Sequence, residues 1–191
     1  ADVEADQRLA DLAPHHVTGA GVHVYILDTG ILGTHVEFTN RMGNGFTSIH
    51  DGLGSTDCHG HGTHVAGTIG ATGNNTAGVV GVNWQVSLMS LKFLAGVDGE
   101  GTSADLLNAF AYAKAMRQLW ESSGGTKGAN IRVLNNSYGG GGFSQAELDA
   151  IRELGDAGIL FVVSAGNEGS SNDQFPTYPT NYIAPNLISV A

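Results

Sequence analysis

The sequence predicts a doubly wound α/β fold: a mostly parallel sheet with helices on both faces. Short apolar runs bounded by Gly, Asn or Asp, several of them rich in β-branched residues, alternate with helical patterns. The length of 191 residues, 41% of them hydrophobic, fits one domain with a sizeable core, and we expect a single domain over 1–191. The expected strands are 22–27, 86–94, 131–135, 159–164 and 187–190.

The first long helix is expected over 103–120. Thr102 precedes it as a cap, and Asp105 follows three residues later, where its carboxylate can return to the cap. The apolar face expected to pack on the sheet consists of Leu106, Phe110, Ala113 and Trp120.

The second long helix is expected over 145–157. Ser144 and Glu147 predict a capping box at its start, and Gly158 predicts its end. Its apolar stripe consists of Leu148, Ile151 and Leu154.

Charge and hydropathy exclude several classes of partner. The 8 basic and 18 acidic residues give a net charge of −10, without a run of Lys or Arg, which disfavours nucleic acid and anionic membrane surfaces. No apolar stretch reaches the ~18–20 residues of a membrane span. The opening ADVEADQRLA lacks the basic and apolar regions of a signal peptide, so we expect that any such segment has been removed.

Polar residues follow three of the expected strands. Asp28-Thr29-Gly30 follows the first, residues 136–140 follow the third and residues 165–169 follow the fourth. Because ligands of such sheets bind beyond the carboxyl ends of the strands, these segments are expected to converge on one functional edge.

The segment DCHGHGTHVAGTIG, residues 57–70, adds histidines to this edge. His61 is expected to begin a helix of small residues, and an ionised Asp28 could fix its tautomer and stabilise the imidazolium. Asn167, on a glycine-flanked turn, is suited to donate to an oxyanion that develops during acyl transfer.

Four segments in this order resemble the subtilisin-like serine proteases. They are VYILDTGI at 24–31, HGTHVAGT at 61–68, NSYGG at 136–140 and SAGNEG at 164–169. The resemblance covers nearly the whole chain and implies an endopeptidase that is secreted and acts on proteins or peptides.

The resemblance also implies roles for individual residues. Asp28 is similar to the aspartate of the catalytic triad, His61 to its general base and Asn167 to the oxyanion donor. The implied substrate-binding residues are Ser137, Tyr138, Gly139 and Gly140 on one side of the cleft, Ser164, Ala165, Gly166 and Glu168 around the pocket, and Gly99, Glu100 and Gly101 on the opposite edge, so that a peptide would lie between two strands.

The nucleophile of the family is expected outside this chain. In the family it lies in a Gly-Thr-Ser-Met-Ala type motif beyond the last matched strand, and the sequence stops at Ala191. Ser103, in a similar Gly-Thr-Ser-Ala run, precedes Asn167 and begins a helix where a capping role suffices, so it is rejected. We therefore expect a fold truncated at its C-terminal side and a complementary C-terminal segment or chain that carries the serine.

A structural calcium ion is the implied cofactor. Family members with a long loop here bind calcium through loop oxygens and an acid similar to Glu37, and the ligands implied in this chain are Glu37, Asn75, Ala77 and Val79. The alternative is a polar turn, and Gly73 looks like an additional residue in the loop.

Other interpretations of the same residues are weaker. The histidines His59, His61 and His64 lack the partner spacing of a zinc site. Glycines at 18–21 precede a strand, whereas a dinucleotide loop follows one. The remaining histidines, His15, His16, His23, His35 and His50, are expected at the surface or in turns, and His64 is expected to be packed.

Two functions remain open at this stage. One is the larger, N-terminal part of an endopeptidase, and the alternative is a non-catalytic module that binds peptides in its cleft. The single cysteine, Cys58, is either free or paired outside this chain.

Overall fold

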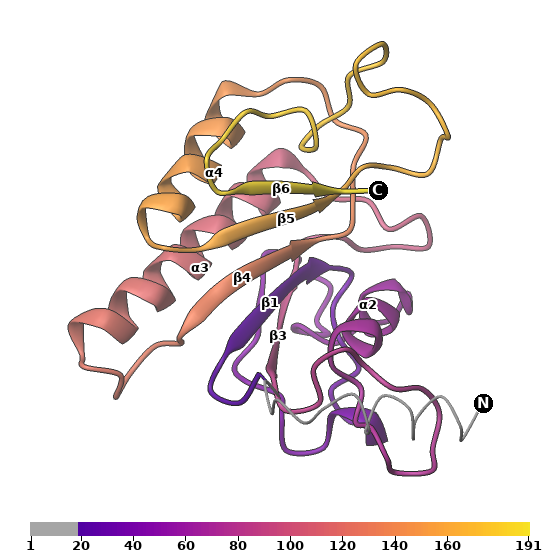
Figure 1. Cartoon of the computed structure of the whole chain (residues 1–191), viewed down its shortest axis with the longest axis vertical. Coiled ribbons are helices and arrows are strands. Elements are labelled where there is room, and N and C mark those ends of the chain that lie inside the picture. The colour runs from indigo at the N-terminus through magenta and orange to yellow at the C-terminus, as the bar shows by residue number, and fades with distance from the viewer. Residues whose placement is uncertain (1–18) are drawn as a thin grey trace.

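A six-stranded parallel sheet forms the centre of the molecule (Figure 1). The computed structural model describes residues 19–191; the predictions for His15, His16 and Thr18 lie outside them. The strand order is β2-β3-β1-β4-β5-β6, which confirms the predicted doubly wound parallel sheet. The strands are β1 (His23–Asp28), β2 (Phe46–Thr47), β3 (Ser87–Lys92), β4 (Ile131–Asn136), β5 (Leu160–Ser164) and β6 (Leu187–Val190).

Helices cover both faces of the sheet (Figure 1). Helix α2 (His61–Gly70) lies on one face, while α3 (Ser103–Ser122) and α4 (Gln145–Asp156) lie on the other; a short 3-10 helix, η1 (Val36–Phe38), packs near α2. None of the helices within residues 19–191 combines the length and apolar character that crossing a membrane requires.

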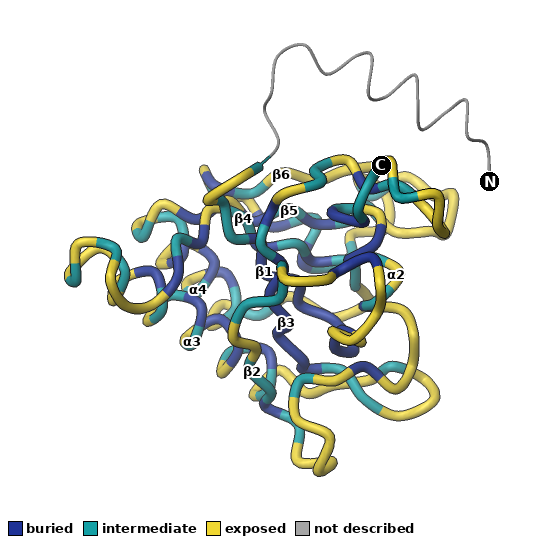
Figure 2. Tube along the Cα trace, turned by 90° about the horizontal axis from the view of Figure 1, so that it is seen from below, coloured by how far each residue is buried: buried dark blue, intermediate teal, exposed yellow. Residues whose placement is uncertain are grey.

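Strand β1 contributes to the apolar core on both faces. Tyr25 and Leu27 pack with α3 and α4, whereas Val24 and Ile26 belong to the cluster under α2. Successive side chains of a strand point to opposite faces, so a strand covered on both sides is apolar at every position. Figure 2 shows the result, a buried central trace surrounded by exposed loops.

The two long helices begin differently from one another. Thr102 and Asp105 form the complete capping box predicted for α3. At α4 only half of the predicted box forms: the Ser144 side chain accepts the backbone N–H of Glu147, but the Glu147 carboxylate accepts the hydroxyl of Tyr182 at 2.9 Å. A tertiary partner therefore replaces the local one.

Three other expectations need correction. His23, predicted at the surface or in a turn, is half-buried and begins β1. His64, predicted to be packed, is exposed, because it lies on the side of α2 turned away from the sheet. Trp120, predicted on the buried face of α3, is half-buried, and its ring packs edge-on against the ring of His23.

The direction in which successive strands are added to the sheet reverses at β1. The chain places β3 on one side of β1 and β4 on the other, and Leu27 of β1 lies in register with Asn136 of β4. Such a reversal is where ligands bind in open α/β sheets.

His23 makes the stability of this fold depend on pH. Burial lowers its pKa, and its Nδ1 accepts the backbone N–H of Asn130 at 2.7 Å. The unfolded chain takes up this proton at about pH 6.5, the folded chain only at lower pH. The stabilisation is therefore complete above about pH 6.5 and is lost as the pH falls through the folded pKa.

We expect acidification from about pH 8 to pH 5 to lower the urea midpoint more in the wild type than in His23→Gln, which cannot titrate. His50→Gln, at an exposed histidine, serves as the control and should behave like the wild type. Equal pH dependence in the wild type and His23→Gln would contradict this assignment.

Candidate active site

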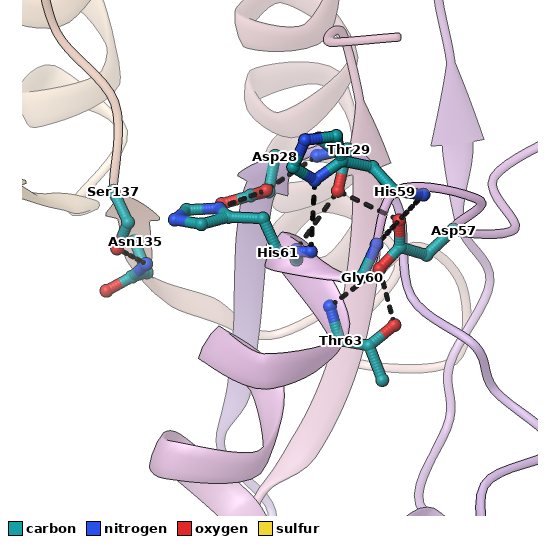
Figure 3. Close-up of polar contacts among 10 residues, drawn as sticks. Asp28, Thr29, Asp57, His59, Gly60, His61, Thr63, Asn135 and Ser137 are labelled. Atoms are coloured by element: carbon teal, nitrogen blue, oxygen red, sulfur yellow. Dashed lines mark hydrogen bonds and ion pairs between the residues drawn. The ribbon is translucent and has the colours of Figure 1, made fainter. Parts of the chain in front are cut away.

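The predicted contact between Asp28 and His61 is present. The Nδ1 atom of His61 lies 2.7 Å from Oδ1 and 2.9 Å from Oδ2 of Asp28 (Figure 3). The Asp28 side chain is completely buried at the end of β1, whereas the His61 side chain is 46% exposed at the start of α2. The backbone N–H of Thr29 also donates to Asp28 Oδ1, at 2.7 Å. This arrangement holds the imidazole by one nitrogen and leaves the other accessible.

Two glycines allow α2 to begin this close to β1. A Cβ atom at Gly62 would lie 2.1 Å from the carbonyl oxygen of Gly30, so only glycine fits there. Gly30 has a φ of +111°, and a Cβ atom on it would lie 2.8 Å from the backbone of Ser55 and Asp57. Three chain segments therefore meet at van der Waals distance beneath His61.

A pocket of about 220 Å³ lies beyond the ends of β4 and β5. It is lined by most of the residues predicted around the substrate pocket: Ser137, Tyr138, Gly139, Gly140, Ser164, Gly166, Asn167 and Glu168. Ala165 does not line it; its N–H donates to Val190, and its carbonyl oxygen accepts the side-chain N–H of Asn172. The two segments predicted to form the walls of the pocket therefore do lie on either side of it, and Ala165 is the one predicted residue that does not line it.

Asn167 and Glu168 lie at the exposed part of this pocket. The Glu168 carboxylate accepts the backbone N–H of Asn167 at 2.9 Å, which fixes the turn between them. The Glu168 carboxylate therefore fixes the backbone from which the Asn167 side chain projects.

The predicted opposite edge forms a small antiparallel bridge. Ala95 and Glu100 exchange backbone hydrogen bonds of 2.8 and 3.0 Å, and Gly99 lies beside the ring of His59. The segment 99–101 is thereby placed next to the histidine segment that precedes α2.

Comparison with known proteins identifies the family of this chain. The sequence profile of the subtilase family matches residues 19–191. The chain belongs to the subtilase family. An "Extracellular serine proteinase" of Thermus sp. (strain Rt41A) is 39% identical over 85% of this chain, and "Subtilisin-like protease 6" of Trichophyton schoenleinii is 40% identical over 78% of it.

A solved subtilase structure shares the fold. The crystal structure of a cold adapted subtilisin-like serine proteinase matches with a TM-score of 0.72 and 29% identity, covering 91% of this chain and 55% of that one. The chain spans about a third of the length of its two curated relatives, since the matches cover 36% and 34% of them.

Four residues that line the pocket were not predicted from the sequence. Thr177, Tyr178, Pro179 and Thr180 complete the lining of the pocket, and Tyr178-Pro179 is a cis peptide. A Pro after an aromatic residue is the only local signal for such a segment.

Asp57 is a further residue near the site that was not predicted from the sequence. It is buried before the start of α2 and accepts hydrogen bonds from Thr29, His59, Gly60 and Thr63. Burial alone raises the pKa of Asp57, but hydrogen bonds from the Thr63 side chain and from backbone N–H groups outweigh burial and lower it to about 2. Asp57 is therefore ionised at neutral pH.

Cys58 is an exposed free thiol three residues before His61. We expect a thiol reagent such as DTNB to label one thiol per native molecule without reductant, and Cys58→Ser to remove the signal. Labelling that appears only after reduction would instead show a disulfide to another chain or segment. In a complete subtilase, a bulky adduct at this position should slow turnover by obstructing the approach to His61.

Proposed function

We propose that this chain is the larger, N-terminal part of the catalytic domain of a secreted subtilisin-type serine endopeptidase whose nucleophilic serine lies outside these residues. The observation that carries the proposal is the buried carboxylate of Asp28 at 2.7 Å from Nδ1 of a half-exposed His61. The name of the Thermus relative, an extracellular proteinase, supports the location.

Asp28 and His61 supply the base of the reaction. The Nδ1–H group of His61 donates a hydrogen bond to Asp28, which leaves Nε2 unprotonated and able to accept the proton of a serine hydroxyl. The ionised Asp28 then stabilises the imidazolium that forms, and His61 returns the proton to the leaving amine. Asn167 is placed at the pocket to donate to the oxyanion of the tetrahedral intermediate.

The substrate is an extended segment of a protein or peptide. Its backbone would pair with residues 137–140 and 99–101 by β-augmentation, and a large apolar side chain would occupy the pocket. Glu100 and Glu168, both exposed near the cleft, favour basic substrate residues elsewhere.

The exposed surface near β6 supports a complementary segment. Ile183, Ile188 and Val190 are 87%, 47% and 51% exposed, and Leu160 of the neighbouring β5 is 44% exposed. Several large apolar side chains exposed on two neighbouring strands and the segment before them are typical of a surface that another segment covers. A further part of the same protease, carrying the serine, would cover it.

In the complete protease, His61→Ala should lower kcat by roughly a million-fold, because the residues of a catalytic triad act as a unit and nearly all of its rate is lost with the general base. Residues 1–191 alone should neither cleave a fluorogenic peptide nor react with a fluorophosphonate probe. Binding of peptide by the complete protein without any cleavage would favour the non-catalytic module. Covalent labelling of a serine within 1–191 would show that the nucleophile has been misassigned.

We further propose that Glu37, Asn75 and the backbone oxygens of Ala77 and Val79 hold a structural calcium ion. Glu37 is 1% exposed, and its Oε1 atom has no hydrogen-bond partner. Its Oε2 atom accepts the side-chain N–H of Asn75 at 2.9 Å, and the backbone at Gly78 approaches Oε1. Arg41 bonds the backbone oxygen of Glu37 and not its carboxylate.

Arg41 lies close enough for its charge to interact with that of Glu37 but makes no salt bridge with the carboxylate, and a buried carboxylate whose Oε1 atom has no hydrogen-bond partner fits a hard cation with oxygen ligands. The bound ion would stabilise the fold by cross-linking Glu37 to the 75–79 loop. Among residues 19–191 no cluster of three or more His, Cys, Asp and Glu offers an alternative metal site.

Calcium at a hundred times its Kd should therefore stabilise the protein by about 2.7 kcal/mol. We expect EGTA to lower the Tm and Glu37→Gln to remove most of that difference, with Glu121→Gln as an exposed carboxylate control. Calorimetric titration of the protein with calcium measures the affinity directly. An unchanged Tm in EGTA and no heat of binding would refute the site.

A further inference from the structure

The carboxylate of Asp57 joins the end of β1 to the first turn of α2. Its Oδ1 atom accepts the hydroxyl of Thr29 and the backbone N–H groups of His59 and Gly60, each at 2.9 Å. Its Oδ2 atom accepts the backbone N–H of Thr63 at 3.0 Å and the Thr63 hydroxyl at 2.6 Å. A single side chain, 8% exposed, therefore binds both sides of His61 in the sequence (Figure 3).

Thr29 extends this connection to the residue that follows His61. Its hydroxyl donates to Asp57 and accepts the backbone N–H of Gly62 at 3.0 Å. Thr29 is also the neighbour of Asp28, whose carboxylate accepts its N–H. The acid that contacts His61 and the backbone that carries His61 are thus held by the same pair of side chains.

The start of α2 depends on this external carboxylate. Its N-cap residue is Gly60, which has no side chain to accept the free N–H groups of the first turn. Asp57 takes that role from outside the helix, with a negative charge at the positive end of the helix dipole.

The backbone before Asp57 is fixed to β3. The Ser90 hydroxyl donates to the carbonyl oxygen of Ser55 at 2.8 Å, and Lys92 Nζ donates to that of Thr56 at 3.0 Å. Lys92 is fully buried and pairs with Asp51 at 2.5 Å. The segment that leads to Asp57 is therefore hydrogen-bonded to the sheet.

We infer that Asp57 is a positioning residue for His61: its carboxylate fixes the start of α2 so that Nδ1 of His61 stays on Asp28. This inference rests on the proposed role of His61 as general base. The His61 ring is half-exposed, and within residues 19–191 Asp28 is the one side chain that it hydrogen-bonds, so its placement depends on the backbone that Asp57 holds. Asp57 touches neither substrate nor the reacting atoms.

The test is Asp57→Asn in the complete protease. The amide keeps the shape of the side chain but removes the charge and turns an NH₂ donor toward either Thr63 or the Thr29, His59 and Gly60 donors. We expect kcat to fall about 10- to 100-fold, because small displacements of a catalytic group cost rates of that order, while KM stays within about twofold. The NMR signal of the proton between His61 and Asp28 should broaden or shift.

Asp105→Asn is the matched control. Asp105 accepts the N–H and hydroxyl of Thr102 at the start of α3, which carries none of the proposed catalytic residues. Both variants should lower the Tm. When kcat is measured at a temperature well below the Tm of each variant, only Asp57→Asn should show a reduced kcat.

A milder pair keeps the inference testable if Asp57→Asn does not fold. Thr63→Val deletes the hydrogen bond from the Thr63 hydroxyl to Asp57 and also the one that this hydroxyl accepts from the Leu32 N–H, and it should lower kcat. Thr63→Ser, which retains the hydroxyl and both hydrogen bonds, should keep kcat near the wild-type value. Wild-type kcat in Asp57→Asn and Thr63→Val, beside an inactive His61→Ala, would overturn the positioning role alone. Full activity of His61→Ala would remove the proposed function together with this inference.

Discussion

A buried carboxylate at the end of the central strand constrains the rest of this structure. Asp28 is completely buried, and an ionised group in that position is stable only if donors surround it. The Thr29 N–H and His61 Nδ1 provide those donors, which requires α2 to begin against the end of β1. Since β4 is the neighbour of β1, the pocket beyond the ends of β4 and β5 lies at the same edge of the sheet as the end of β1 that carries Asp28.

The sheet and the two long helices could be predicted because their signals are local. Buried parallel strands are apolar at every position, and α3 carries its cap and its apolar stripe within a few residues. The two-residue strand β2 is too short to have a period. Glu147 turned to Tyr182, 35 residues away, and no local pattern could indicate which partner it would prefer.

In the candidate site, too, the residues with a local sequence signal were predicted and those without one were not. Asp28 and His61 stand at a strand end and a helix start, where sequence patterns are informative, and their contact is present as predicted. Asp57 was not predicted, because its importance depends on contacts such as that with Thr29, 28 positions earlier in the chain. Pocket residues 177–180 were missed for the same reason, since the chain returns to the pocket only in three dimensions.

Helix α2 is held by polar contacts because its composition leaves little else. Its buried residues are Gly62, Ala66, Gly67 and Gly70, and only Val65 and Ile69, both partly buried, add larger apolar side chains to the cluster beneath it. This face buries less apolar area than the Leu, Ile and Phe side chains under α3 and α4. Apolar contacts are also non-directional, whereas hydrogen bonds fix distance and angle. A helix that must hold an imidazole within hydrogen-bond distance of a fixed carboxylate is therefore better located by Asp57 and Thr29 than by a larger apolar face.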